Sequence, residues 1–434
     1  MTIISTEAHA LLRDDSDAVE RLASRLIKPV NNNLVERPWG GRMLLDYKGL
    51  RGSSRPTAAP GMGFGEAFEI AAYDRDPEAR RFPSRLLLGD GSSLTLPELL
   101  ERHAAAILGD DFADRYGACF PLLPKTLDIA EMLSVQGHPP GNTEVYIIIA
   151  ADPGATIRLG FSEDIDRDEF ARALRAGREQ QAELAALGDG LTESGEFQSL
   201  LKAWFADREA TSAELWTRPI GAAFAEGAWP VARRLLDALK DVYWRVLDVM
   251  NAVPVTPGQV IYNATPRRLL SAHELASAEV HALGNPEGKE ILALEVRRPG
   301  PTFRAWDNVR FPLREIDIEA ALDALNLKAT SVDEFIVEPA AVAGRPGVFV
   351  SVDADGFRVE HLRPKADLAI SVPHEAAHCL HAIRGEASFR TPDGIEIGQL
   401  RCGESALVPI GTGAYVVSST DADNEIVKVG LTSS

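Results

Sequence analysis

The segment LSVQGHPPGNTEVY, Leu133 to Tyr146, places three potential metal ligands close together and leads into an apolar run. The ligands are Gln136, His138 and Glu144. Residues two apart in an extended strand point to the same face, so Gln136 and His138 can approach one ion. The turn residues Pro139 to Asn142 can return Glu144 on the next strand. Imidazole, carboxylate and amide oxygen suit a borderline divalent ion such as zinc. We therefore expect a metal site on a sheet, and one ligand of that site is still to be found.

Length and composition indicate an ordinary globular chain with more than one domain. The 434 residues are too many for one small core, and contents of 45% hydrophobic and 25% charged residues are typical of globular proteins. The net charge of -19 argues against nucleic acid or an anionic membrane as a partner, because both require a basic face. Any anionic substrate needs a local cluster of Lys and Arg.

Cysteine usage and the absence of apolar segments bear on the compartment. The three cysteines, Cys119, Cys379 and Cys402, are too few and too scattered for a disulfide framework or a metal knuckle. The first residues contain several acidic groups and no long apolar core, and no later stretch is long enough to span a bilayer. We therefore expect a cytoplasmic protein, with monomer and homodimer both open.

The expected secondary structure changes in character along the chain. Strand-like segments such as EAFEIAAYD and EVYIIIA dominate to about residue 160, and residues 166–249 are rich in Ala, Leu, Glu and Arg at helical spacing. Short strands resume at VIYNATP, a helix is expected over 317–325, and alternating apolar segments follow between Gly-rich turns. The pattern predicts a mainly β fold with a helical insertion.

Six motifs in order resemble those of a known family. They are PWGG (38–41), GEAFEI (65–70), PLLPKTLDIAEMLSVQGHP (121–139), NTEVY (142–146), VHALGN (280–285) and TFRAWD (302–307). This set resembles type I phosphomannose isomerases, which are zinc-dependent cupins. The resemblance covers roughly residues 35–165 and 250–325, with a weaker echo in 395–434. LSVQGHP joined to a downstream Glu is specific, whereas PWGG alone is weak.

The resemblance implies two cupin-like jelly-roll barrels plus a helical domain. The metal-binding catalytic cupin domain is expected in residues 30–165 and 250–335, with the helical insertion in 166–249. Residues 336–434 are expected to form a C-terminal cupin-like domain without metal, because Ala414 stands where a cupin turn would have His.

The family's four metal ligands correspond to Gln136, His138, Glu144 and His281, which implies one Zn²⁺ per chain, with another divalent ion possible. His273, eight residues before His281, is its rival, because RRLLSAHELASAE (267–279) interrupts the family's turn here. His281 is favoured because it lies where a loop leads into an apolar strand.

The resemblance also implies an aldose–ketose isomerase that interconverts mannose 6-phosphate and fructose 6-phosphate through a metal-stabilised enediol. Lys125 and Ser134 match the family's phosphate-side residues, and Arg304 matches its active-site arginine, expected in both binding and catalysis. Many members have Lys shortly before the metal-binding Glu, but this chain has Asn142. Asp307 is therefore the expected proton-transfer group, with Glu295 as the alternative; either could instead form a structural salt bridge.

Two other readings remain open. An iron-dependent cupin oxygenase also combines imidazoles with a carboxylate, although Gln136 would support iron poorly. A sugar-sensing or lectin-like protein could keep the fold without turnover. The histidines of PHEAAHCLHAIRG, His374, His378 and His381, have tempting spacing, but the segment is typical of a loop entering a strand, and we expect packing or surface roles.

Overall fold

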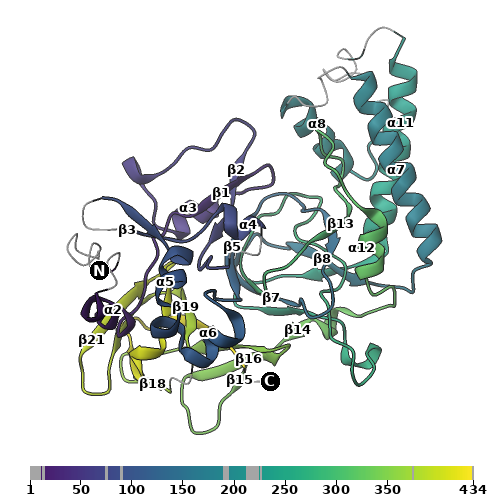
Figure 1. Ribbon diagram of the computed structural model, residues 1–434. Helices are drawn as coiled ribbons and strands as arrows, with labels where there is room; N and C mark the ends of the chain where they lie inside the picture. The colour runs from purple at the N-terminus through teal and green to yellow at the C-terminus, as the bar shows by residue number, and fades with distance from the viewer. Residues whose placement is uncertain are drawn as a thin grey trace.

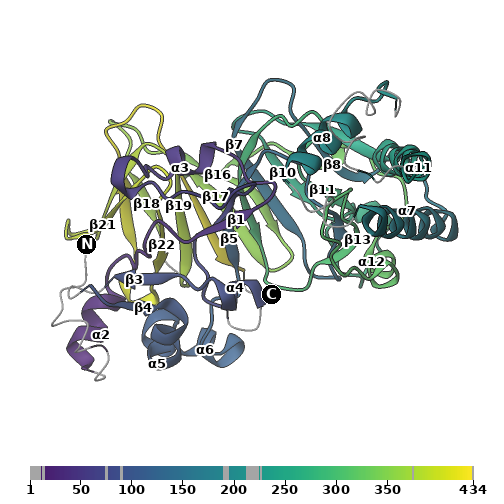
Figure 2. The ribbon, with the colours of Figure 1, turned by 90° about the horizontal axis from the view of Figure 1, so that it is seen from above.

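Two pairs of antiparallel sheets, a small two-stranded sheet and a group of helices make up the described part of the protein (Figures 1 and 2). The computed structural model describes residues 11, 15–73, 77–87, 91–188, 195–211, 224, 227–373 and 376–432. Both views place the long helices at the opposite end of the molecule from the C-terminal strands, which are drawn in yellow.

The first pair of sheets contains a seven-stranded and a five-stranded sheet. The seven-stranded sheet has the order β1 (Leu34–Arg37), β2 (Gly63–Phe68), β5 (Leu123–Ile129), β12 (Ile291–Arg297), β7 (Glu144–Ala151), β10 (Val260–Asn263) and β14 (Ile336–Val337). The five-stranded sheet has the order β13 (Phe303–Trp306), β6 (Val135–Gly137), β11 (His281–Ala282), β8 (Thr156–Phe161) and β9 (Met250–Pro254). Alternate residues of the two sheets, such as Tyr146 and Leu159, share one buried apolar cluster, so the sheets pack face to face.

The second pair lies C-terminal to the first in the chain. Its six-stranded sheet has the order β15 (Ala340–Ala341), β16 (Val348–Ala354), β17 (Phe357–Leu362), β24 (Glu425–Leu431), β19 (His378–Arg384) and β22 (Ser405–Val408). Its four-stranded sheet has the order β18 (Ile370–Val372), β23 (Tyr415–Ser418), β20 (Glu386–Arg390) and β21 (Glu396–Arg401). Val145 and Ile147 of β7 join Val359 and Val427 in one cluster, so the six-stranded and seven-stranded sheets pack together. The sheet-rich antiparallel architecture agrees with the expected fold class, while the division into two jelly-roll barrels and the domain boundaries stay predictions.

The long helices cover the outer face of the five-stranded sheet. They are α7 (Arg167–Leu187), α8 (Gly195–Ala206), α11 (Trp229–Asp248) and the shorter α12 (Ile318–Ala324). Asp166 caps α7 by accepting a hydrogen bond from the backbone N–H of Glu169 at 2.8 Å. Gly177 allows α7 to approach β13 closely, because a Cβ at this position would lie 2.8 Å from the Trp306 ring. One apolar cluster joins these helices to Trp306 and its strand neighbours.

Two helices that the sequence analysis did not single out lie among the strands before residue 160. Residues 96–116 form α5 (Leu96–Leu108) and α6 (Asp110–Tyr116). Thr95 and Glu98 form a capping box at the start of α5, with Pro in its first turn, and this signal was present in the sequence. The remaining elements are α2 (Ser16–Ala23), α3 (Met43–Tyr47), α4 (Pro77–Arg81), β3 (Arg85–Leu87), β4 (Ser93–Thr95) and the 3-10 turns Gly52–Ser54, Arg267–Leu269, Val332–Glu334 and Ile410–Thr412.

Two of the three closely spaced histidines lie on β19 and are buried. His378 contacts the Tyr415 hydroxyl at 2.7 Å, and His381 contacts the Ser405 hydroxyl at 2.7 Å. His374 lies outside the described residues. Within the part of the chain that the structure describes, no helix is both long enough and apolar enough to cross a membrane.

Candidate metal centre

Strand register brings the distant candidate residues to one place between the seven-stranded and five-stranded sheets. Gln136 on β6 pairs with His281 on β11 and with Arg304 on β13. Because side chains alternate along a strand, these three face inward, while Val135 and Ala282 face the helical cluster. Across the gap, Glu144 on β7 occupies the inner face of the opposite sheet. One strand pairing therefore brings together Gln136 and His281, which are 145 residues apart in the sequence.

His138, Glu144 and His281 form a compact buried cluster whose potential ligand atoms all lie within 4.8 Å of one another. The Nε2 atom of His138 is 2.9 Å from Glu144 Oε1, and the Nε2 atom of His281 is 3.4 Å from Glu144 Oε2. The three side chains are at most 3% exposed. Two imidazoles and one carboxylate in this arrangement form a candidate site for a divalent ion.

Hydrogen bonds orient both imidazoles toward the same point. His138 Nδ1–H donates to the Pro301 carbonyl at 3.0 Å, and His281 Nδ1–H donates to the Glu279 carbonyl at 2.8 Å. A carbonyl only accepts, so each Nδ1 carries the proton and each Nε2 keeps its lone pair. His138 Nε2 has no hydrogen-bond partner among the described residues. An orphaned, preoriented imidazole nitrogen is what a metal site requires.

Electrostatics favour the protonation states that bind metal. Burial lowers the pKa of His281 to about 4, so its ring is neutral at pH 7. Burial alone would raise the pKa of Glu144, but the neighbouring imidazoles and the Arg297 guanidinium hold that pKa well below its usual range. A neutral imidazole and an ionised carboxylate are the ligand forms that do not have to lose a proton before coordination.

Gln136 reaches the cluster with its amide nitrogen toward the histidine. Its Nε2–H donates to His281 Nε2 at 3.0 Å, while its Oε1 accepts from the Ser134 hydroxyl at 3.1 Å. A half-turn about the last side-chain bond would exchange the two amide atoms and present oxygen to the cluster. Ser134 thus contacts the fourth predicted ligand directly.

Loop closure explains why His281 rather than His273 joins the cluster. The backbone N–H of Thr265 donates to the carbonyl of Ser277 at 2.8 Å, which closes the base of the intervening segment. His273 lies in that closed loop and is exposed, whereas His281 is 1% exposed on β11. The inserted residues 267–279 are therefore accommodated outside the sheets, and β11, which follows them, keeps its register with β6.

Three residues that the sequence analysis missed support Glu144. Asn263 Nδ2 lies 3.4 Å from Glu144 Oε2 and 3.2 Å from the Tyr146 hydroxyl, and Tyr146 itself donates to Glu144. Arg297 Nε lies 3.8 Å from Glu144 Oε1. The sequence contains a signal for Tyr146, because it lies two residues after Glu144 in the same strand and its side chain therefore shares the face of Glu144. Asn263 and Arg297 come from partner strands, and their contacts depend on register.

A cavity of about 180 Å³ adjoins the cluster and is rich in cations. Its charged lining comprises Arg37, Lys125, Arg297, Arg304 and Arg314 with Glu36, Glu66, Glu144 and Glu295. Ser134, Gln136 and His138 also line it. In a chain with a net charge of -19, a cavity whose cations outnumber its carboxylates is a local exception that suits an anion. The local cluster of Lys and Arg required by an anionic substrate is present.

The two predicted proton-transfer carboxylates lie in different environments. Glu295 lines the cavity, contacts Lys125 at 2.9 Å, and has a pKa raised by burial despite the opposing Lys125 charge. Asp307 does not line the cavity; its carboxylate accepts from Arg314 Nε at 2.7 Å and from Arg310 at 3.3 Å. The structure therefore does not bring Asp307 to the cluster, because the chain turns away after β13 and two guanidinium groups hold the carboxylate.

Asn142, at the position where the resemblance would place a Lys, lies in the turn before β7. Its backbone carbonyl accepts from the N–H of Ala278 at 2.8 Å. Its side chain packs against Gly300, where a Cβ would come within 2.2 Å of the Asn142 amide nitrogen. Asn142 is not among the described residues that line the cavity.

Known proteins resemble this chain in part of its sequence. Residues 85–159 match the family model "Phosphomannose isomerase type I, catalytic domain", which includes Gln136, His138 and Glu144 and ends before His281. A putative mannose-6-phosphate isomerase from Bacillus subtilis (strain 168) is 31% identical over 137 residues, which is 29% of this chain and 38% of that protein. The chain thus matches well under half the length of that curated relative.

Solved structures match over a much larger part of the chain. A putative mannosephosphate isomerase from Archaeoglobus fulgidus has 18% identity and a TM-score of 0.56, and the match covers 94% of this chain and 98% of that one. A mannose 6-phosphate isomerase bound with zinc and yttrium has 17% identity and a TM-score of 0.56, with coverage of 95% and 100%. A phosphomannose isomerase variant from Salmonella typhimurium has 18% identity, a TM-score of 0.56 and the same coverage. The resemblance inferred from the motifs is confirmed: residues 85–159 match the model of the type I phosphomannose isomerase catalytic domain, and the chain has the fold of solved mannose-phosphate isomerases.

Proposed function

We propose that this protein is a mannose-6-phosphate isomerase that interconverts mannose 6-phosphate and fructose 6-phosphate. The observation that supports this most is the buried cluster of His138, Glu144 and His281 beside a cation-rich cavity. An aldose–ketose isomerisation needs a polarised carbonyl and a proton transfer between adjacent carbons, and a phosphosugar also needs cations. Each requirement has a matching group in the cavity.

His138, Glu144, His281 and, after rotation of its amide, Gln136 would hold one zinc ion. Such an ion would polarise the sugar carbonyl and stabilise the charge that develops on the sugar oxygens. The preoriented Nε2 atoms and the ionised carboxylate support this donor set. Tyr146 and Asn263 would keep the carboxylate in position by their contacts with it.

Arg304, Lys125 and Ser134 would hold the substrate. Arg304 opposes Gln136 across the β6–β13 pairing, so its guanidinium is close to the ligand set and suits an oxyanion or a phosphate. Lys125 lies between Glu66 at 3.6 Å and Glu295 at 2.9 Å, so an incoming phosphate would compete with these carboxylates.

Glu295 is the carboxylate that this geometry favours for proton transfer. It lines the cavity, and its pKa is raised by burial, which makes the carboxylate a stronger base than an exposed Glu. Lys125, at 2.9 Å, would hold it in place. The role expected for Asp307 finds no support in the contacts described above.

The test combines metal analysis with an isomerase assay on the full chain. We expect about one zinc per chain, reversible loss of turnover on chelation, and loss of bound zinc in His281→Ala but not in the matched control His273→Ala. Metal-replete protein should also exchange solvent deuterium into the sugar phosphate. Zinc-loaded protein that neither isomerises nor exchanges would overturn the proposal and favour a sugar-binding protein or a cupin oxygenase.

A further inference from the structure

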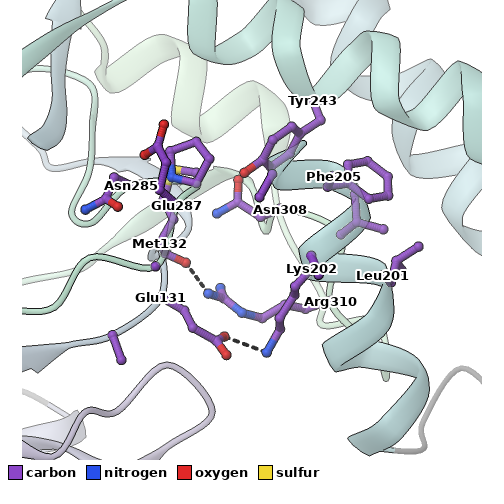
Figure 3. Close-up of a pocket in the computed structure, with 16 residues that line it drawn as sticks. Glu131, Met132, Leu201, Lys202, Phe205, Tyr243, Asn285, Glu287, Asn308 and Arg310 are labelled. Carbon is purple, nitrogen blue, oxygen red and sulfur yellow. Dashed lines mark hydrogen bonds and ion pairs between the residues drawn. The ribbon is translucent and has the colours of Figure 1, made fainter. Parts of the chain in front are cut away.

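A second cavity, of about 370 Å³, lies between the helices and the loops that follow β5, β11 and β13. α8 and α11 line one side, and the three loops line the other. Figure 3 shows Lys202 of α8 reaching across the cavity to Glu131, which lies on the same side as Met132. None of the described residues that line it also lines the metal-site cavity, so this is a separate site.

The wall of this second cavity offers an apolar surface with aromatic rings. Met132, Leu201 and Val309 line it together with Phe205 and Tyr243. The Phe205 and Tyr243 rings are 5.2 Å apart between centroids and meet edge to face. Concave, mostly apolar walls with a few polar groups are typical of small-molecule sites, and this volume suits a compound of one or two rings.

The wall carries two cations and two carboxylates, and the two cations, Lys202 and Arg310, lie together at the end away from Glu287 (Figure 3). Lys202 and Glu131 form an ion pair at 2.5 Å, with side chains 32% and 35% exposed, so Lys202 can exchange partners. Arg310 is more than nine-tenths buried, and its carboxylate partner Asp307 also serves Arg314. Two guanidinium groups therefore share one carboxylate.

Arg310 is also incompletely satisfied. Its Nε has no hydrogen-bond partner among the described residues, and burial lowers the pKa of its guanidinium. A buried cation in this state gains from an added anion.

We propose that this cavity binds a small aromatic anion and that its occupancy is coupled to the metal site. The ring would lie between Phe205 and Met132, and the anionic group would lie at Lys202 and Arg310. The coupling, which rests on the proposed metal function, follows from shared contacts. Arg310 donates to the Met132 carbonyl, two residues before Ser134, and competes for Asp307 with Arg314, which lines the metal-site cavity.

The direction of the coupling follows from this competition. An anion that contacts Arg310 weakens the pair between Arg310 and Asp307, so Asp307 binds Arg314 more strongly. Arg314 lines the metal-site cavity while it is paired with Asp307, so a stronger pair neutralises more of its positive charge there, which favours a divalent cation. Zinc should bind more tightly by about 3- to 10-fold when the anion is present, and the anion should bind more tightly by the same factor when zinc is present.

The binding test uses naphthalene-2-sulfonate, a fluorescent aromatic anion of two fused rings, with zinc-free full-length protein. We expect saturable binding of one probe per chain, weakened about 10-fold in Lys202→Met and abolished in Ala206→Leu, which fills the cavity. Arg233→Met, an equally drastic change at an exposed position of α11, should leave the affinity within about twofold. Equal affinity in all four proteins would mean that the probe binds elsewhere, and would overturn the proposed site whatever the metal function.

The coupling test repeats the probe titration with saturating zinc and the zinc titration with saturating probe. The fold-change in probe affinity caused by zinc should equal the fold-change in zinc affinity caused by the probe. Arg314→Met should still bind the probe, but neither ligand should then change the affinity of the other. Arg314 is 48% exposed, so this variant is expected to fold. Probe binding in the wild type that is unchanged by bound zinc would overturn the coupling while leaving isomerase activity to be judged by its own assay.

Discussion

Asp128 and Glu290 form a buried carboxyl pair beneath the turn that carries the PWGG motif. Asp128 Oδ2 accepts from the Leu44 N–H at 2.7 Å, and Glu290 Oε1 accepts from the Met43 N–H at 2.9 Å. The two carboxyl groups also contact each other, and Gly41 lies so close that a Cβ would clash with both. Two carboxylates at this separation cannot both ionise without cost, so they share a proton.

Replacing Asp128 with Asn should remove a pH dependence of stability. Burial raises the pKa of Asp128 from 3.8 to about 8, so the folded protein keeps a proton that the unfolded chain releases. Its stabilising effect is greatest below the unfolded pKa and is lost as pH rises through the folded pKa. Between these two pKa values the free energy of unfolding should fall by about 1.4 kcal/mol per pH unit. The fall levels off near the folded pKa, so it amounts to about 2 kcal/mol between pH 6 and pH 8. An Asn keeps an acceptor for Leu44 and a donor for Glu290, and it does not ionise.

The assay is urea unfolding followed by circular dichroism at pH 6, 7 and 8 for the wild type and Asp128→Asn. We expect the difference between the two proteins to move by about 2 kcal/mol in favour of the variant as pH rises. Asp46→Asn is the matched control, because Asp46 lies on α3, the short helix whose Leu44 N–H donates to Asp128, and its side chain is 62% exposed; its curve should run parallel to the wild type. Parallel curves for Asp128→Asn as well would refute the shared proton.

Three further predictions concern the metal, the substrate and packing. His281→Ala should lose bound zinc while His273→Ala retains it, as measured by elemental analysis of dialysed protein. Arg304→Met should lower kcat/KM for mannose 6-phosphate by about 100-fold with little change in melting temperature, because a charge-assisted contact is lost; unchanged kinetics would make this arginine a scaffold residue. Gly177→Ala should destabilise by about 1–3 kcal/mol in thermal unfolding, because its Cβ would overlap an indole ring, whereas Gly195→Ala, with open space around it, should not.

Local rules were sufficient for the first half of the candidate site. The spacing of Gln136, His138 and Glu144 depends on the period of two in a strand and on a short turn, which are properties of neighbouring residues. The helices α7, α8 and α11 were also foreseeable, since their Ala-, Leu- and Glu-rich segments carry helical periodicity. The capping box of α5 is an equally local signal, although the apolar segments on both sides of it are strands.

The remaining choices depended on contacts between segments far apart in the chain. The amino-acid sequence by itself determined the ligand types, the excess of helix formers in the insertion and the motif order that resembles the isomerases. Only the tertiary structure decided that His281 pairs with Gln136, that Glu295 faces the cavity and that Asp307 is held by two arginines. The physical reason is that the side-chain period of a strand is two. A shift of one residue in any pairing would turn the opposite set of side chains inward, and the pairing is set by the packing of whole sheets, which no short segment encodes.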